Sequence, residues 1–416
     1  MNASVNERKE HMKNTDDKII HTPSKSESIH DEKQELPIKE KQNFNNSNRK
    51  GKRYDDFFEM STSLAALTPE EILEALNTKD PFEMRSFSQK LKEKEVELDR
   101  KLTLDEIKQL FPCPVDRISL PDKRDHTKAE IFRKEIKSVI HNEPIANDTG
   151  SFIFFQHLRK AGGTHFCSVA NQNLPREVVP RYYCMPDRMW HSSQHPNHSG
   201  AGYMTHYTNE EIITNMKNRG FRIAGNEWDP FRKDFLELPA LLITSFRSPM
   251  DRAVSQFRFE CLEHRGCHID TIEEYWKRRG ELVNVYTWTF SNRRSGRAML
   301  EQRKKVIKER VETLQIAIDT LSQFHLVLFI DWLYYSTAMI QEVMGFEKID
   351  EDELTNVVRP HIHQAPERNE AEKTKYDAKS YLSEEMYASM NHDLALDEIL
   401  TDIAKRLFLE RLVCEI

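Results

Sequence analysis

Short apolar runs alternate with longer stretches of helical periodicity from about residue 150 onward. Four runs, SFIFFQH, FRIAGNE, PALLITSF and FHLVLFI, have the length and the aromatic and β-branched content of buried strands. Three of them lead into a helical pattern, and the chain closes on the amphipathic stretch LALDEILTDIAKRLFLERL. This alternation predicts an α/β domain at 150–416, with helices in layers around a central parallel sheet.

A helical extension is expected before this domain, at residues 56–149. TPEEILEAL begins with Thr68 and has Glu71 three residues later, which is the pattern of a capping box. LTLDEIKQLF repeats the pattern with Thr103 and Glu106. No residue pattern in the extension indicates chemistry, so it is interpreted as packing or partner contact.

Residues 1–55 differ from the rest because they are rich in Lys, Glu, Asn and Ser and nearly free of aromatic side chains. Such a segment cannot bury enough apolar surface to offset the entropy of ordering it. We therefore expect a disordered polar tail ahead of the helical extension.

Composition excludes some classes of protein and leaves the compartment open. With 61 Lys+Arg against 68 Asp+Glu the net charge is -7, which does not favour a nucleic-acid binder. No run approaches the ~20 apolar residues of a membrane span, and the N-terminus lacks the apolar core of a signal peptide. The expectation is a soluble chain of unknown location. Cys261 and Cys267 in CLEHRGC could form a disulfide or remain thiols.

The first candidate site is the segment FIFFQHLRKAGGTHF at 152–166, where a buried strand runs into a glycine turn and then a helix. Backbone N–H groups at such a helix start attract anions, and glycines allow close approach of a ligand. Lys160 adds a positive charge and Thr164 a hydroxyl. The lysine precedes Gly162 and Gly163, so this is not a Walker A loop.

The second candidate site is LLITSFRSPMDRAVSQFRF at 241–259, again a strand that turns into a helix. Arg247 stands at the carboxyl end of the strand, where ligands bind in open α/β sheets. Ser255 follows eight residues later on the helix. An arginine fork and a hydroxyl suit a second phosphate, so the two sites together indicate a ligand with two separated phosphates.

This combination resembles the sulfotransferases that use 3′-phosphoadenosine-5′-phosphosulfate (PAPS). HLRKAGGTHF looks like their 5′-phosphosulfate loop, commonly H-x-P-K-T-G-G-T-S-L in the carbohydrate branch, with Arg159 in place of Pro and His165 in place of Ser. FRSPMDRAVSQFRF looks like their 3′-phosphate motif, R-x-P-x-x-R-x-x-S. FSNRRSGRAML is similar to the N-R-Q-T-R-M-L segment of heparan sulfate 2-O- and 6-O-type enzymes, with an extra Gly296.

The resemblance implies a P-loop-like domain that moves a sulfonate from PAPS to a hydroxyl, in the way that kinases move phosphoryl groups. Lys160 would neutralise the departing phosphate. The remaining donor-binding residues implied are Ala161, Gly162, Gly163, Thr164, His165, Arg247, Ser255, Arg293 and Arg297. No metal is implied.

The sequence offers two kinds of residue, a glutamate and several histidines, as candidates for the catalytic base. Glu227 closes the strand FRIAGNEW, where the resembled family carries its base; the alternative is an ordinary salt-bridge partner of an arginine. His206 is the first rival, together with His191, His195 and His198. These histidines could also bind zinc, although their spacing matches no standard zinc site.

A carbohydrate acceptor is favoured by the 2-O- and 6-O-type match, and that branch works mostly in the Golgi lumen. Basic residues from Arg293 to Lys305 could line a groove for a glycosaminoglycan or another anionic polysaccharide, or form a solvated helix face. The alternative function is a catalytically inactive nucleotide-binding or interaction protein with the same fold. A kinase or NTPase is disfavoured because its lysine order is missing. The oligomeric state is not indicated.

Overall fold

A computed structural model describes residues 82–118, 122–145, 147–181, 183–186, 190, 204–227, 229–263, 267–278, 282–292, 307–349 and 378–416. All of them belong to one compact unit, residues 60–416. The expected polar tail and the expected helix after Thr68 lie outside the described residues.

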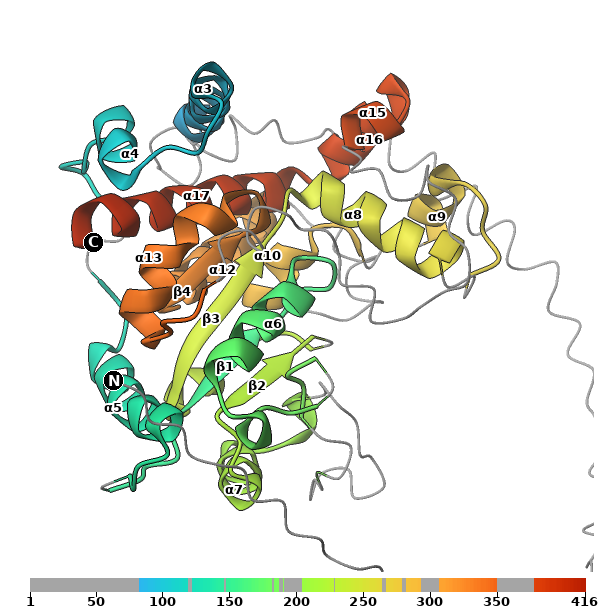
Figure 1. The fold of residues 1–416 in the computed structure, drawn as a ribbon. Helices are drawn as coiled ribbons and strands as arrows, with labels where there is room; N and C mark the ends of the chain where they lie inside the picture. The colour runs from blue at the N-terminus through green and yellow to red at the C-terminus, as the bar shows by residue number, and fades with distance from the viewer. Residues whose placement is uncertain are drawn as a thin grey trace, which may run out of the picture. The chain divides into compact units, whose positions relative to one another are not determined.

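The four predicted strands form one parallel sheet (Figure 1). They are β1 (Phe152–Gln156), β2 (Ile223–Asn226), β3 (Ala240–Phe246) and β4 (Leu326–Phe329), arranged in the order β2-β1-β3-β4. Every residue of the four strands is buried, as expected for strands covered on both faces. The prediction of an α/β domain with a parallel sheet is confirmed.

The strand order contains a switch in direction between β1 and β3. From β1 the chain goes to β2 on one side, whereas from β3 it goes to β4 on the other side. Neighbouring strands whose connections leave in opposite directions open a crevice at their carboxyl ends, and open α/β sheets bind ligands there. Both predicted phosphate loops begin at these two strand ends.

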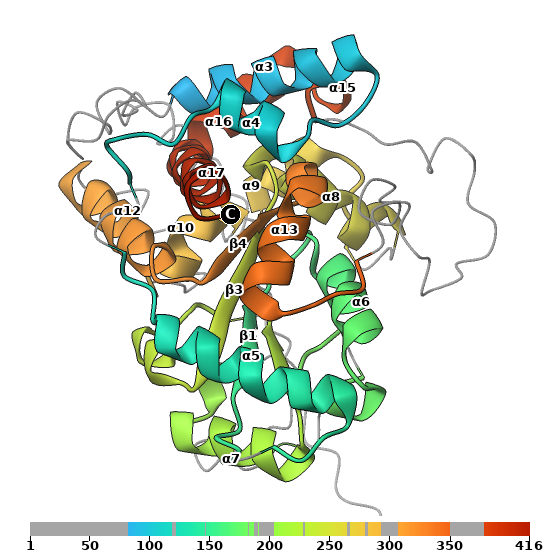
Figure 2. The same ribbon diagram turned by 60° about the vertical axis from the view of Figure 1, so that its left-hand side comes forward.

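Helices pack along the sheet. α5 (His126–His141) contacts β3, and α13 (Leu333–Met344) contacts both β4 and α5, so the two lie on one face (Figure 2). The C-terminal α17 (Ala395–Glu415) contacts β4, α10 (Val285–Phe290) and α12 (Ile307–Leu321). The other described helices are α3 (Phe82–Leu98), α4 (Leu104–Leu110), α6 (Gly163–Asn173), α7 (Asn209–Arg219), α8 (Pro249–Phe257), α9 (Ile272–Arg278), α15 (Ala378–Tyr381) and α16 (Glu384–Asp393). Among the helices described, none is both long and apolar enough to cross a bilayer.

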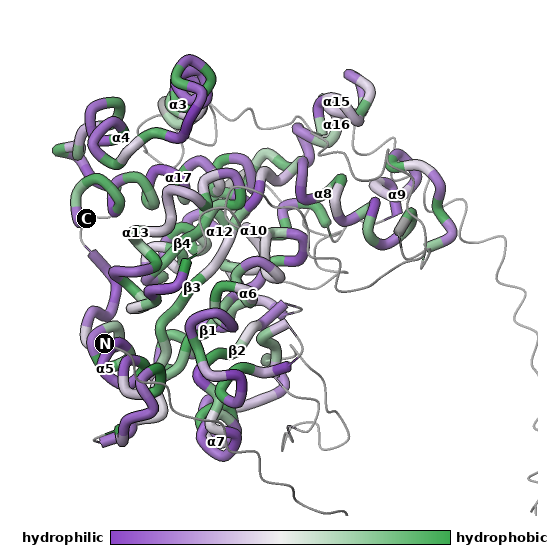
Figure 3. The backbone as a smooth tube through the Cα atoms, viewed as in Figure 1, coloured by the Kyte–Doolittle hydropathy of each residue, from purple (hydrophilic) through white to green (hydrophobic). Residues whose placement is uncertain are grey.

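The helices of the predicted extension share the core of the sheet. Phe87 of α3, Ile107 of α4 and Phe132 of α5 belong to the same buried cluster as β1, β3 and β4. Most residues of β3 and all of β4 belong to this cluster, and much of both strands has hydrophobic colouring in Figure 3. α4 begins as predicted, with Thr103 and Glu106 forming a capping box. The described part of the extension is therefore packed into the α/β unit.

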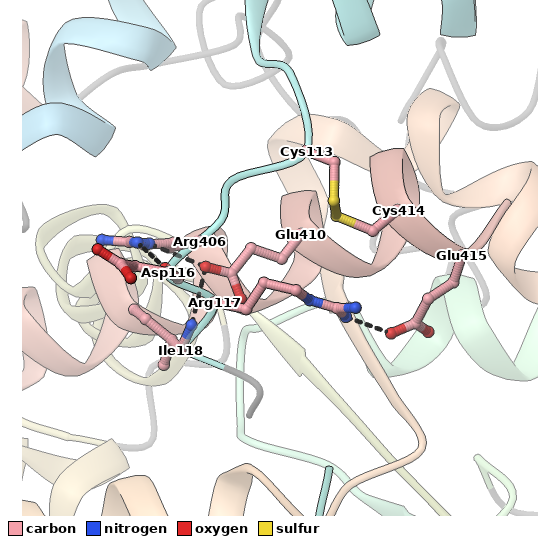
Figure 4. The surroundings of a disulfide bond; sticks show 8 residues. All are labelled: Cys113, Asp116, Arg117, Ile118, Arg406, Glu410, Cys414 and Glu415. Atoms are coloured by element: carbon pink, nitrogen blue, oxygen red, sulfur yellow. Dashed lines mark hydrogen bonds and ion pairs between the residues drawn. A yellow bond between two sulfur atoms is a disulfide. The ribbon is translucent and has the colours of Figure 1, made fainter. Parts of the chain in front are cut away.

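Three disulfides pair all six cysteines. Cys113–Cys414 joins the segment after α4 to the end of α17, across a sequence separation of 301 residues (Figure 4). Beside it Arg117 donates to Glu415 at 2.6 Å, and the backbone N–H of Ile118 donates to the buried Glu410 at 3.0 Å. Cys261 pairs with Cys267, one of the two outcomes left open by the sequence, and Cys167 pairs with Cys184.

Breaking the long-range disulfide should weaken the fold more than breaking the short one. In the chain-entropy account a crosslink stabilises more when it closes a longer loop. We expect Cys113→Ser with Cys414→Ser to lower the free energy of unfolding by about 2–5 kcal/mol, measured by urea denaturation. Cys261→Ser with Cys267→Ser, whose cysteines are 6 residues apart, is the matched control. An equal or larger loss in the control would contradict this ranking.

Candidate functional site

A row of buried polar side chains crosses three strands near their carboxyl ends. Gln156 of β1 is the register partner of Asn226 on β2 and of Thr244 on β3. Asn226 donates to the Gln156 side chain at 2.9 Å, and the Thr244 hydroxyl donates to the Gln156 carbonyl at 2.9 Å. These bonds fix the three strand ends relative to one another, and therefore also the loops that follow them.

The first phosphate loop turns tightly after this row. The Ala161 N–H donates to the Leu158 carbonyl at 3.0 Å, and the Ser245 hydroxyl of β3 donates to the Ala161 carbonyl at 2.6 Å. Lys160 and Gly162 both have positive φ, +65° and +95°. A lysine in this region is strained, and such strain concentrates at functional sites. The loop is thus held in an unusual shape by a direct bond from the neighbouring strand.

Gly163 starts α6 and has no room for a side chain. A Cβ there would lie 1.8 Å from Nε2 of His157, which is buried against it. The N-cap residue Gly162 offers no side-chain bond to the first turn of α6. The backbone N–H groups of that turn therefore receive no hydrogen bond from an N-cap side chain, and a helix start of this kind suits an anion. Thr164 and His165 are half-buried in the same turn.

The second loop is held by a tyrosine from α10. The Tyr286 hydroxyl accepts from the Arg247 N–H at 3.2 Å and donates to the Arg247 carbonyl at 2.9 Å. The buried carboxylate of Asp397 on α17 accepts from the N–H groups of Tyr286 and Thr287, at 3.0 and 2.8 Å. Burial raises the pKa of Asp397 to about 6, against the effect of these donors. The C-terminal helix therefore supports the backbone of the predicted phosphate arginine.

α8 begins with Ser248 as N-cap and Pro249 in the first turn. Arg247 before it is half-buried, whereas Ser255 is fully buried. The Ser255 hydroxyl has no hydrogen-bond partner among the described residues. A buried hydroxyl without a partner costs free energy.

Glu227 follows β2 directly and lies beside the first loop. Its Oε1 is 3.9 Å from Nδ1 of His157 and 3.8 Å from Nε of Arg159, and its side chain is only 13% exposed. Burial raises the pKa of Glu227, while the charges of Arg159 and Lys160 oppose the rise. Burial, with the same two cations, lowers the pKa of His157 to about 3, so its imidazole is neutral near neutral pH. Glu227 thus faces an arginine, as the salt-bridge interpretation requires, and its pKa is also raised, as a base would require.

The first loop is also contacted by η4 (Arg258–Glu263), a π-helical turn that extends α8. The ring centroid of Phe259 lies 4.0 Å from Nζ of Lys160, a cation–π contact. Glu260 accepts from Nη1 of Arg159 at 2.9 Å. Single π-helical turns occur often at functional sites. Sequence reasoning missed His157, Phe259 and Glu260, although all three stand within or beside the quoted motifs.

The structure describes only some of the remaining predicted site residues. His206 ends η2 (Met204–His206), which is tied to the loop after β2 because the Thr205 N–H donates to Asp229 at 3.0 Å. Arg293, Arg297, and the rival histidines 191, 195 and 198 lie outside the described residues. Over the ranges that are described, no group of His, Cys, Asp and Glu could hold a metal ion.

Fold and site together define a parallel α/β protein in which the two candidate phosphate loops begin at the switch point of its sheet. Comparison of the chain with protein-family models, curated proteins and solved structures finds no match.

Adding one methyl group at Gly163 should disturb the first loop. Gly163→Ala would force the His157 ring from its buried position, and overpacking of this kind costs about 1–3 kcal/mol of unfolding free energy. His157→Ala removes the obstacle, so the double variant should be more stable than the sum of the two single losses predicts. Strict additivity in a denaturant titration would show that the His157 ring is not what excludes a side chain at Gly163.

Proposed function

We propose that the protein is a PAPS-dependent sulfotransferase that moves a sulfonate to a hydroxyl of a carbohydrate. The observation that supports this most is the meeting of two anion-binding loops at one sheet edge. The first follows β1 and the second follows β3, the strands are paired, and Ser245 links the second strand to the first loop. A donor with separated 5′- and 3′-phosphates matches two sites at neighbouring strand ends.

The residues of the two loops fit such a donor in their chemistry. The 5′-phosphate would bind at the start of α6, where no N-cap side chain bonds the backbone N–H groups and Gly163 has no side chain to block a close approach. Arg247, its backbone fixed by Tyr286, and the unsatisfied hydroxyl of Ser255 suit the 3′-phosphate. In this proposal the fold is the P-loop-like, three-layer type that the resembled family has.

Sulfonate transfer needs in-line geometry, a positive charge at the leaving oxygen and a base for the attacking hydroxyl. Lys160, held over the Phe259 ring, would supply the positive charge. Glu227 would accept the proton of the acceptor hydroxyl, because its pKa is raised by burial and it lies at the same loop. His206 is the second candidate for the base.

Three disulfides support an oxidising compartment for this activity, because such bonds are rare where thiols are kept reduced. That setting agrees with the Golgi lumen, where the resembled carbohydrate branch works. The acceptor class rests on the FSNRRSGRAML resemblance, and an anionic polysaccharide is the partner we propose.

The donor site is tested by thermal unfolding with 3′,5′-adenosine bisphosphate, using 5′-AMP as the comparison ligand. A ligand present at 100 times its dissociation constant adds about 2.7 kcal/mol to the stability of the folded state. We expect the bisphosphate to raise the thermal midpoint, AMP to raise it much less, and Arg247→Ala to remove the difference.

Arg133→Ala is the matched control, since Arg133 lies on α5 and donates to the Glu342 carbonyl of α13. It should preserve the selectivity for the bisphosphate. Equal shifts with both nucleotides, or no shift in folded protein, would refute the two-phosphate site. A bisphosphate response without transfer of labelled sulfonate to any carbohydrate would favour the inactive nucleotide-binding protein.

The base is tested by the pH dependence of transfer. A carboxylate accepts a proton only when ionised, so kcat/KM should rise with pH through the pKa of Glu227, above its ordinary value of 4.5. Glu227→Gln should lower kcat by about 10²–10⁴-fold and leave bisphosphate binding unchanged. If Glu227→Gln keeps full activity while His206→Ala loses it, the histidine is the base.

A further inference from the structure

Arg159 lies between two carboxylates that come from different parts of the chain. Its Nη1 donates to Glu260 at 2.9 Å, whereas its Nε is 3.8 Å from Oε1 of Glu227. The first distance is that of a charge-assisted hydrogen bond, and the second is too long for one. Both carboxylates are largely buried, at 14% and 13% side-chain exposure. The guanidinium is therefore held closer to one carboxylate than to the other.

Glu260 is itself fixed by its neighbours. The Tyr275 hydroxyl of α9 donates to its Oε2 at 2.8 Å, and the Gln256 amide of α8 donates to its Oε1. The π-helical turn η4 brings Glu260 and Phe259 to the first loop, where Phe259 lies against both Lys160 and Arg159. Arg159 is thus bonded to a carboxylate that two other side chains hold in place.

We propose that Glu260 is a positioning residue for the catalytic base: its ion pair with Arg159 keeps the guanidinium from closing onto Glu227. The catalytic part of this inference rests on the proposed function, in which Glu227 is the base. The positional part concerns three side chains and can be tested without any activity.

Closure of Arg159 onto Glu227 would change the chemistry of the carboxylate. Among the described residues, the titratable groups that face Glu227 are His157, Arg159 and Lys160 of the first loop, and Glu260 is bonded to Arg159. His157 is neutral near neutral pH, so the two cations decide how far burial can raise the pKa of Glu227. An opposite charge in direct contact lowers the pKa of a carboxyl and makes it a weaker base.

The positional test is a carbon-13 NMR titration of the glutamate carboxyl groups in the full chain, with the Glu227 signal assigned by its loss in Glu227→Gln. Glu260→Gln releases Arg159 and should lower the pKa of Glu227 by about one unit. Arg159→Gln removes the guanidinium and should raise that pKa by about one unit. Opposite shifts from two variants of one ion pair are not expected from general loosening of the fold.

A double variant separates positioning from simple charge repulsion between the two carboxylates. If Glu260 acts through Arg159, adding Glu260→Gln to Arg159→Gln should leave the pKa of Glu227 where Arg159→Gln put it. If the double variant shows the same fall as Glu260→Gln alone, Glu260 acts directly and the proposal is wrong. Glu274→Gln, which removes the partner of Arg278 on the surface of α9, is the control and should shift nothing.

The catalytic consequence is measured from the pH profile of kcat/KM, on the acid limb where the value rises with pH. The limb should move to lower pH in Glu260→Gln and to higher pH in Arg159→Gln, following the NMR values. Opposite NMR shifts in a protein without transfer activity would support the ion-pair arrangement and refute the proposed function. An unchanged pKa of Glu227 in an active enzyme would overturn the positioning role and leave the proposed function standing.

Discussion

The parallel pairing of β1 with β3 is the constraint on which the rest of the site depends. The register aligns Gln156, the last residue of β1, with Thr244, which lies two residues before the end of β3, so both loops start at the same edge of the sheet. The chain leaves β1 toward β2 and leaves β3 toward β4, the arrangement at which open α/β sheets bind ligands at their strand ends. Strand order, rather than either loop alone, brings Lys160 and Arg247 to one edge.

Around this edge, support comes from elements far apart in the sequence. The hydrogen bond between the buried Gln156 and Asn226 joins the ends of β1 and β2, and His157 and Glu227 are the next residues along the chain. On the other side, Asp397 of the last helix holds α10, and Tyr286 of α10 holds the backbone at Arg247. Satisfied buried networks of this kind fix a single arrangement, because breaking one bond leaves its partner unpaired in a low dielectric.

The C-terminal helix has two roles for the same physical reason. Its first half supports the site through Asp397, and its end is joined to the segment after α4 by Cys113–Cys414 and by the bond from Arg117 to Glu415. A helix anchored at both ends and buried along most of its length cannot shift as a unit without cost. The helices α3 and α4 are thus connected to the sheet through the element that also holds the second loop.

The sequence by itself determined the parallel sheet, the glycine turn and the helix start at Thr103, because these depend on local periodicity and on side chains a few residues apart. It also placed Glu227 at a strand end. Only the tertiary structure decided the pairing of Cys113 with Cys414, the contact of His157 with Gly163 and the position of Arg159 between two carboxylates. The disulfide and the position of Arg159 depend on residues far apart along the chain, and the contact of His157 with Gly163 depends on how tightly the loop between them turns.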